Sequence, residues 1–169
     1  MKTKTINLFG GPGSGKSTAA AGLFHQLKLR GENCEIVTEF AKHMTWKEDF
    51  NTLQNQIYVH AKQHDRMFHL EGKVGFIITD SPTIMGLIYC DWSRFPKSFE
   101  QLARDLFFQA DNLCYFIERT KTYQQAGRSQ SEEEARQKDL DILKLLEKHQ
   151  IPFKKIPAES CVEEILRDL

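Results

Sequence analysis

The sequence has no net charge, because its 23 lysine and arginine residues balance 23 aspartate and glutamate residues. Without an overall positive field, a DNA or RNA substrate would need a local basic patch on the protein. The composition also lacks the bias of a disordered chain, since hydrophobic residues make up 40% and charged residues 27%. Its 169 residues can bury a substantial core without disulfides or metals. We therefore expect a single folded domain over residues 1–169.

Long hydrophobic runs and paired cysteine motifs are missing as well. The apolar run near the N-terminus is interrupted by Gly10 and Gly11, so we expect no signal peptide, and no stretch is long enough to predict a membrane span. Four widely separated cysteines match no zinc or redox spacing: Cys34, Cys90, Cys114 and Cys161. Cys34 and Cys114 lie in strand-like runs, where a reduced thiol behaves as a small hydrophobe. These absences favour a cytoplasmic protein with free thiols and no membrane contact.

Apolar runs alternate with segments of helical periodicity along the whole chain. Strands are predicted over residues 5–9, 34–38, 74–79, 113–117 and 151–156. Helices are predicted over residues 16–30, 52–70, 99–110 and 131–149, with a short terminal helix from residue 160. Capping boxes are predicted at Ser131 and Ser160, and the long helix is predicted to carry Leu53, Ile57 and Ala61 on one apolar stripe. This alternation predicts an α/β fold with helices on both faces of a mainly parallel sheet.

The run from Gly10 to Ser17 carries the strongest functional signal. It fits the pattern G-x-x-x-x-G-K-[ST] and lies between a predicted strand and a predicted helix, as a phosphate-binding Walker loop requires. Backbone N–H groups and the helix dipole would hold the phosphates of ATP, and Lys16 would reach the β- and γ-phosphates. Predicted nucleotide-binding residues are Gly11, Pro12, Gly13, Ser14, Gly15, Lys16, Ser17 and Thr18.

A second element, Asp80, follows four apolar residues at the end of a predicted buried strand. This is the usual Walker B position, so Asp80 and the Ser17 hydroxyl are predicted to bind Mg²⁺. Walker-type motor and switch ATPases commonly place a glutamate next, to activate water, but here the next residue is Ser81. The missing carboxylate favours phosphate transfer to a bound hydroxyl over hydrolysis.

The sequence gives weaker signals for the residues that would bind the acceptor of the phosphate. Glu39 follows the second predicted strand and could accept the proton of an attacking hydroxyl, fix that hydroxyl, or be a solvated strand-end residue. Lys42 could contact a phosphate or be surface charge.

On the long helix, Gln56, Gln63 and Arg66 could line a pocket and read a base edge, or lie on a solvated face. His60 and His64 have metal-ligand spacing on this helix. Solvated or packing histidines are the favoured interpretation, because no further ligand lies nearby in sequence.

The polar segment from about residue 119 to 131 follows a predicted strand, so it is either a surface connection or a mobile lid. It carries Arg119, Lys121 and Arg128 around Tyr123, with Gly127 beside Arg128. An arginine closing over the transferred phosphoryl group would stabilise its charge, and Arg128 is the predicted catalytic arginine beside Lys16 and Glu39.

With these residues in place, the chain resembles the thymidylate-kinase-like P-loop kinases over nearly its whole length, and within them small, often phage-encoded members. The matching parts are GGPGSGKST, TEFAK, IITDSP and the Y-x-x-A-G-R-x-Q segment before an acidic helix start. The resemblance implies a three-layer P-loop kinase fold with a five-stranded sheet. It also implies an acceptor pocket between Glu39, the long helix and Asp80.

Two departures bear on the acceptor. Thymidylate kinases carry Asp-Arg where this chain has Asp80-Ser81, which argues against plain thymidylate kinase activity. Nicotinamide riboside kinases share a similar architecture, but their Glu-x-Ala-Arg stretch ends in arginine where this chain has Lys42. Some phage members phosphorylate the hydroxymethyl group of 5-hydroxymethyl-deoxyuridine in DNA, on the way to hypermodified thymidines.

The leading hypothesis is therefore an ATP- and Mg²⁺-dependent kinase acting on a nucleoside hydroxyl, with that hydroxymethyl group in DNA as the specific acceptor. The host cytoplasm is its expected location if the chain is phage-encoded. One alternative is a soluble nucleoside or nucleoside-monophosphate kinase, which the neutral charge favours, and another is a non-kinase NTP-binding switch ATPase. The oligomeric state is left open.

Overall fold

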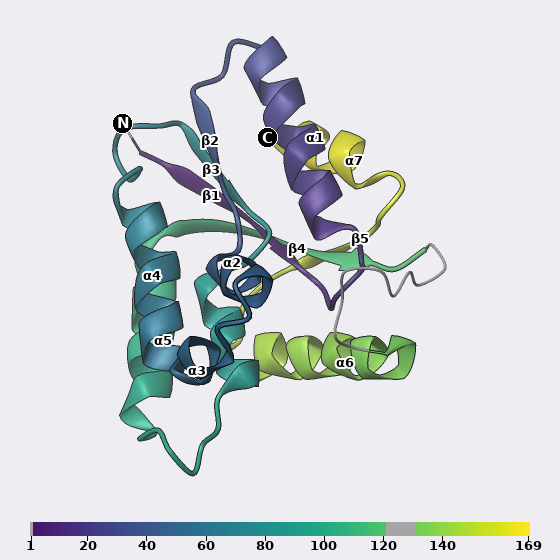
Figure 1. Ribbon diagram of the computed structural model, residues 1–169. Coiled ribbons are helices and arrows are strands. Elements are labelled where there is room, and N and C mark those ends of the chain that lie inside the picture. Colours follow the sequence, from purple (N-terminus) through teal and green to yellow (C-terminus); the bar gives the residue numbers. More distant parts are fainter. Residues whose placement is uncertain (1, 121–130) are drawn as a thin grey trace.

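The five strands form one all-parallel sheet in the order β2-β3-β1-β4-β5 (Figure 1). A computed structural model describes residues 2–120 and 131–169. Over these residues the strands are β1 (Lys4–Phe9), β2 (Cys34–Val37), β3 (Phe76–Thr79), β4 (Asp111–Glu118) and β5 (Lys154–Pro157). The predicted α/β class and five-stranded sheet are thus confirmed, and the sheet is parallel throughout.

Helices cover both faces of this sheet. They are α1 (Lys16–Leu29), α2 (Phe40–Trp46), α3 (Phe50–Gln54), α4 (Gln56–Phe68), the 3-10 helix η1 (Thr83–Tyr89), α5 (Ser98–Gln109), α6 (Glu132–Lys148) and α7 (Cys161–Asp168). Strand β1 supplies side chains to both layers by its alternation: Ile6 and Leu8 pack with α1 and α7, whereas Phe9 packs with α5 and α6.

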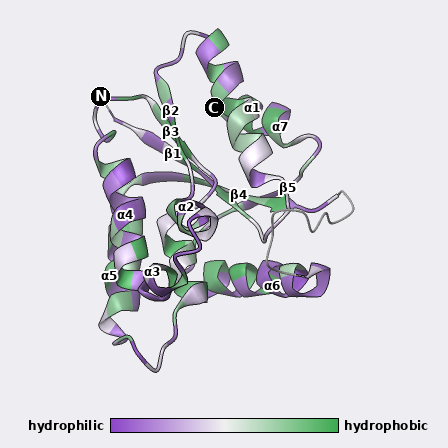
Figure 2. Ribbon diagram, in the orientation of Figure 1, coloured by the Kyte–Doolittle hydropathy of each residue, from purple (hydrophilic) through white to green (hydrophobic). Residues whose placement is uncertain are grey.

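The hydropathy of helix α6 changes along its length (Figure 2). Helix α6 is hydrophilic at its start, where Ser131 and Glu134 form the predicted capping box, and more hydrophobic toward its end, where Ile142 and Leu146 are buried. The capping box predicted at Ser160 is wrong, since its hydroxyl donates to Glu164 Oε1 at 2.7 Å instead of capping the backbone of α7.

The predicted long helix over residues 52–70 is two helices. The break lies at Asn55, whose side chain accepts a hydrogen bond from Tyr58 N and so begins α4. The predicted apolar stripe of this helix is also wrong, because Ile57 is 46% exposed and Ala61 is exposed. Helix α4 instead buries a mixed stripe: Gln56, Val59, His60, Gln63 and Met67. The buried face of α4 therefore carries polar as well as apolar side chains.

Candidate active site

The Walker loop turns sharply between β1 and α1. Gly13 and Gly15 have φ values of 77° and 101°, in the left-handed region where glycine is favoured. Gly15 is also the residue that precedes α1, so the N–H groups at the start of α1 point at the loop. This geometry makes the loop a ready site for phosphate groups.

Lys16 folds back over the Walker loop. Its Nζ donates to the Gly10 and Gly11 carbonyl oxygens at 2.6 and 2.9 Å. Burial lowers the pKa of the Lys16 ammonium, and three nearby carboxylates oppose that shift: Glu39, Asp80 and Asp139. The ammonium is therefore held at the loop by acceptors that a phosphate group could replace.

Ser17 and Asp80 meet where α1 begins and β3 ends. The Ser17 hydroxyl donates to Asp80 Oδ2 at 2.6 Å. Asp80 is buried, and its Oδ1 has no hydrogen-bond partner among the described residues. A buried, unpartnered carboxylate oxygen beside a hydroxyl fits Mg²⁺, which prefers oxygen ligands. The residues present therefore suit the metal expected from the sequence.

Glu39 immediately precedes α2 and is only partly exposed. Burial raises the pKa of its carboxyl above the ordinary range, the Lys16 ammonium opposes the rise and the Asp80 carboxylate adds to it. These effects place Glu39 within electrostatic reach of the Walker loop. Lys42, in the first turn of α2, is exposed and also opposes the rise.

Helix α4 lies against the start of α2 and against η1. The backbone N–H of Phe40 donates to Gln63 Oε1 at 2.9 Å, and the Gln56 amide donates to the Leu53 carbonyl at 2.7 Å. Both glutamines are buried, so their interpretation as solvated helix residues is wrong. Gln63 Nε2 has no partner among the described residues, which leaves a buried donor beside Glu39's helix.

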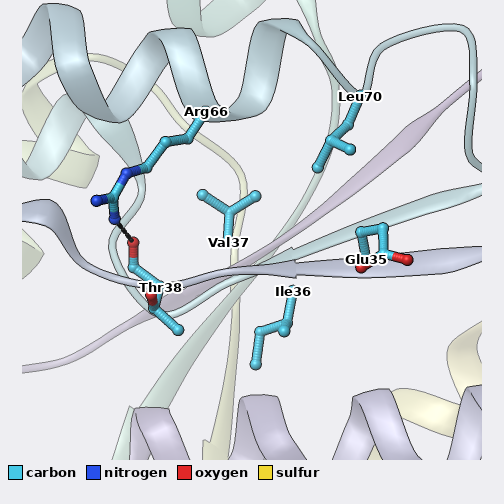
Figure 3. Close-up of a pocket in the computed structure, with 6 residues that line it drawn as sticks. All are labelled: Glu35, Ile36, Val37, Thr38, Arg66 and Leu70. Carbon is cyan, nitrogen blue, oxygen red and sulfur yellow. Dashed lines mark hydrogen bonds between the residues drawn. The ribbon is translucent and has the colours of Figure 1, made fainter.

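Arg66 lies apart from the two glutamines, on the outer side of α4. Its Nη1 donates to the Thr38 carbonyl at 3.1 Å (Figure 3). Its guanidinium lies over the Phe40 ring. Arg66 and Thr38 line a groove of about 310 Å³ beside β2, the edge strand of the sheet. Arg66 therefore supports the backbone next to Glu39 from outside the Walker loop.

His60 and His64 lie on the other side of α4. His60 is buried, and its ring packs edge-on against Phe99 at 5.5 Å. Burial lowers its pKa, which the neighbouring Thr83 backbone partly opposes, and neither ring nitrogen has a hydrogen bond of acceptable geometry. The described part of the chain contains no cluster of three or more metal-ligating His, Cys, Asp or Glu side chains.

Sequence reasoning missed two parts of the site. Asp139 on α6 accepts from Gly11 N at 2.5 Å and from Arg119 Nη2 at 3.1 Å, while Arg119 Nη1 donates to the Pro12 carbonyl at 2.8 Å. Tyr89, which is 43% exposed, ends η1; partial desolvation raises its pKa to about 12, and the Glu39 carboxylate adds to the rise. No local signal marks either residue, because each reaches the site through helix packing.

The rest of the predicted lid lies outside the described residues, including Lys121, Tyr123, Gly127 and Arg128. Within the described residues, no helix is both long and apolar enough to cross a membrane.

The chain is similar to one protein family and to solved structures of kinases. A family model described as an AAA domain matches residues 5–164. No curated protein sequence matches the chain. Among solved structures, deoxyadenosine kinase from M. mycoides with bound dATP matches with a TM-score of 0.56 at 19% identity, covering 97% of this chain and 98% of that chain.

Two further structures match along their whole lengths. Thymidylate kinase from Ehrlichia chaffeensis has a TM-score of 0.64 at 14% identity, covering 99% of this chain and 98% of that chain. The M. mycoides deoxyadenosine kinase with bound dCTP has a TM-score of 0.59 at 18% identity and 97% coverage of both chains. The chain thus has the fold of nucleoside and nucleotide kinases, and the resemblance expected from the motifs is confirmed at the level of fold.

Proposed function

The chain belongs to the AAA domain family, and we propose that within this family it is a kinase that transfers the γ-phosphate of ATP to a hydroxyl of a nucleoside moiety. The observation that carries the proposal is the placement of Glu39. Its carboxylate lies within electrostatic range of Lys16 and Asp80, while the position directly after Asp80 holds Ser81 and not a water-activating glutamate. A carboxylate placed across from the phosphate site suits an acceptor hydroxyl.

In the donor half of the site, which we define as the Walker loop with Lys16, Ser17 and Asp80, the chain's task is to hold ATP. Lys16 would exchange the Gly10 and Gly11 carbonyls for the β- and γ-phosphate oxygens. Ser17 and Asp80 would hold Mg²⁺, which when bound neutralises charge on those oxygens. The N–H groups at the start of α1 would complete the cradle.

In the acceptor half, defined by Glu39, Gln56, His60, Gln63 and Tyr89, the chain's task is to orient the hydroxyl. Glu39 would accept its proton as the phosphoryl group arrives, and the raised pKa brings this carboxyl closer to the working pH of a general base. The Gln63 amide nitrogen, which has no partner among the described residues, would donate to a base edge of the acceptor. Arg128 remains our proposed partner for the charge on the transferred group.

For the specific acceptor we propose the hydroxymethyl group of 5-hydroxymethyl-deoxyuridine within phage DNA, with the host cytoplasm as the setting. Exposed aromatic side chains support a polymer acceptor. Trp46, 72% exposed, ends the short helix that begins after Glu39, and Phe50 in α3 is also exposed. Bases flanking the target could stack on such rings without sequence preference.

The test is an acceptor screen with γ-labelled ATP. Oligonucleotides containing 5-hydroxymethyluracil are compared with thymine oligonucleotides, free 5-hydroxymethyl-deoxyuridine, thymidine, dTMP and deoxyadenosine. Label on the modified oligonucleotide alone supports the full proposal. Label on a free nucleoside or nucleotide, with none on DNA, would keep the kinase and replace its acceptor.

Two other functions remain in competition. The neutral net charge and the fold shared with deoxyadenosine and thymidylate kinases favour a soluble nucleoside or nucleotide kinase as the second candidate. A switch ATPase would hydrolyse ATP at one rate whatever acceptor is present, so an acceptor-independent rate would reject both kinase versions.

A further inference from the structure

One carboxylate ties a distant helix to the Walker loop. The two oxygens of Asp139 are divided between two partners, the backbone N–H of Gly11 and the guanidinium of Arg119. Arg119 in turn donates to the Pro12 carbonyl, so the contact closes a ring of loop, arginine and carboxylate. Both side chains are largely withdrawn from water, with 7% of Arg119 and 20% of Asp139 exposed. Charge-assisted hydrogen bonds in such surroundings are the strong ones.

Helix α6, and not a phosphate group, accounts for the absence of a side chain at position 11. A Cβ at Gly11 would lie 2.6 Å from the Ala135 carbonyl oxygen and 2.7 Å from Asp139 Oδ1, both on α6. The N–H of Gly11 already donates to Asp139, and its carbonyl oxygen already accepts a hydrogen bond from Lys16 Nζ. The first turns of α6 are thus packed directly on the back of the Walker loop.

We propose that Asp139 is a positioning residue for ATP: it fixes the Walker loop through Gly11 and fixes Arg119 against Pro12, so that nucleotide affinity depends on α6. Asp139 contacts Gly11 and Arg119 and acts through these two neighbours. Its negative charge also helps to keep Lys16 protonated in a buried site. The role rests on the nucleotide-binding part of the proposed function and not on the acceptor.

The test measures binding of Mg–ATP by titration calorimetry, which needs no acceptor. In Asp139→Asn the amide oxygen can still accept from Gly11, but the amide nitrogen now faces the guanidinium, so only the Arg119 bond is lost. The dissociation constant should rise about tenfold or more. Glu132→Gln is the matched control on the same helix, because Glu132 pairs with Arg136 on the surface; it should bind like the wild type.

A double mutant separates positioning from general damage to the fold. In an Arg119→Ala background, Asp139→Asn should weaken binding by less than about twofold, since its partner is gone. Gly11→Ala, which pushes α6 away, should weaken binding as Asp139→Asn does. Should Asp139→Asn not fold, Gly11→Ala and Arg119→Ala test the same bonds from their other ends.

Wild-type affinity in Asp139→Asn, or an equal loss with and without Arg119, would overturn the proposal. Failure of the kinase assignment would show differently, as tight ATP binding by the wild type without transfer to any acceptor.

Discussion

The donor and acceptor halves of the site handle their buried polar groups differently. In the donor half these groups mostly bond to one another, Lys16 to two loop carbonyls, Ser17 to Asp80, and Asp139 to Gly11, while Asp80 Oδ1 and Ser14 Oγ have no partner among the described residues. In the acceptor half, Gln63 Nε2 and both nitrogens of His60 are buried without a good hydrogen bond among the described residues. Buried polar atoms without partners are rare and call for an explanation. The donor half is therefore largely shaped before ATP arrives and keeps oxygen atoms for a metal, whereas the unpartnered groups of the acceptor half are nitrogens that a ligand would satisfy.

The largest effect is expected from Lys16→Ala in the donor half. Without the ammonium, the β- and γ-phosphate charge loses its partner, and kcat should fall about a thousandfold or more. Acceptor affinity should stay unchanged, which direct binding of the acceptor checks. Lys28→Ala, on the exposed side of the same helix, is the control; transfer at the normal rate by Lys16→Ala would refute the site.

Glu39→Gln should remove the function of the acceptor half and leave ATP binding in the donor half unchanged. Removing a general base costs about a hundredfold or more in kcat, with the KM for ATP unchanged. Because the pKa of Glu39 is raised above its ordinary 4.5, wild-type activity should fall with acid at a pH above that value.

This acid limb should vanish from the pH profile of Glu39→Gln. The matched control is Glu35→Gln on β2, where the carboxylate pairs with Lys28 at the surface. An unchanged acid limb in Glu39→Gln would assign the limb to another group.

Asp80→Asn tests the metal within the donor half. An amide oxygen is a weaker ligand than a carboxylate, so the Mg²⁺ concentration needed for half-maximal transfer should rise about tenfold. EDTA should stop transfer by the wild type, and added Mg²⁺ should restore it. Asp111→Asn, at the amino end of β4 and paired with Lys2, should behave like the wild type.

Gln63→Met separates acceptor recognition from ATP binding. The KM for the acceptor should rise about tenfold while the KM for ATP does not change, since the amide is replaced by an apolar chain. Leaving Phe40 N without its acceptor should also lower the free energy of unfolding by about 1–3 kcal/mol. Gln101→Met on α5, an exposed site, is the control for both measurements.

The smallest effect is expected from His60→Phe and concerns stability at low pH. The pKa of His60 is lowered in the fold, so below its unfolded pKa of 6.5 the unfolded chain binds more protons and stability falls as the pH falls. His60→Phe should lose about 1 kcal/mol less than the wild type between roughly pH 7.5 and 5 in urea unfolding.

Some acid sensitivity should remain in that variant, because His149 is also buried with a lowered pKa. His25→Phe, at an exposed position of α1, should keep the full wild-type loss. An identical loss in His60→Phe and wild type would mean that the fold does not lower the pKa of His60.

The sequence predicts the donor half better than the acceptor half for a physical reason. The Walker loop and Asp80 are encoded by short motifs at strand ends, and a parallel sheet brings those ends together. The orientation of α4 is not encoded locally: periodicity favoured Ile57 and Ala61 as its buried stripe, but packing buries Gln56, His60 and Gln63. Asp139 escaped prediction because its bond to Gly11 spans 128 residues.

The position of β1 in the sheet has a consequence for how the protein is made. This first strand is central, and its partners are synthesised much later: Ile6 pairs with Ile78 on β3 and with Leu113 on β4. Such non-local pairing slows folding, because long loops must close before it forms. The Gly11–Asp139 bond is later still. The nucleotide loop, which leaves the ribosome long before α6, therefore acquires its native anchor only after α6 has emerged.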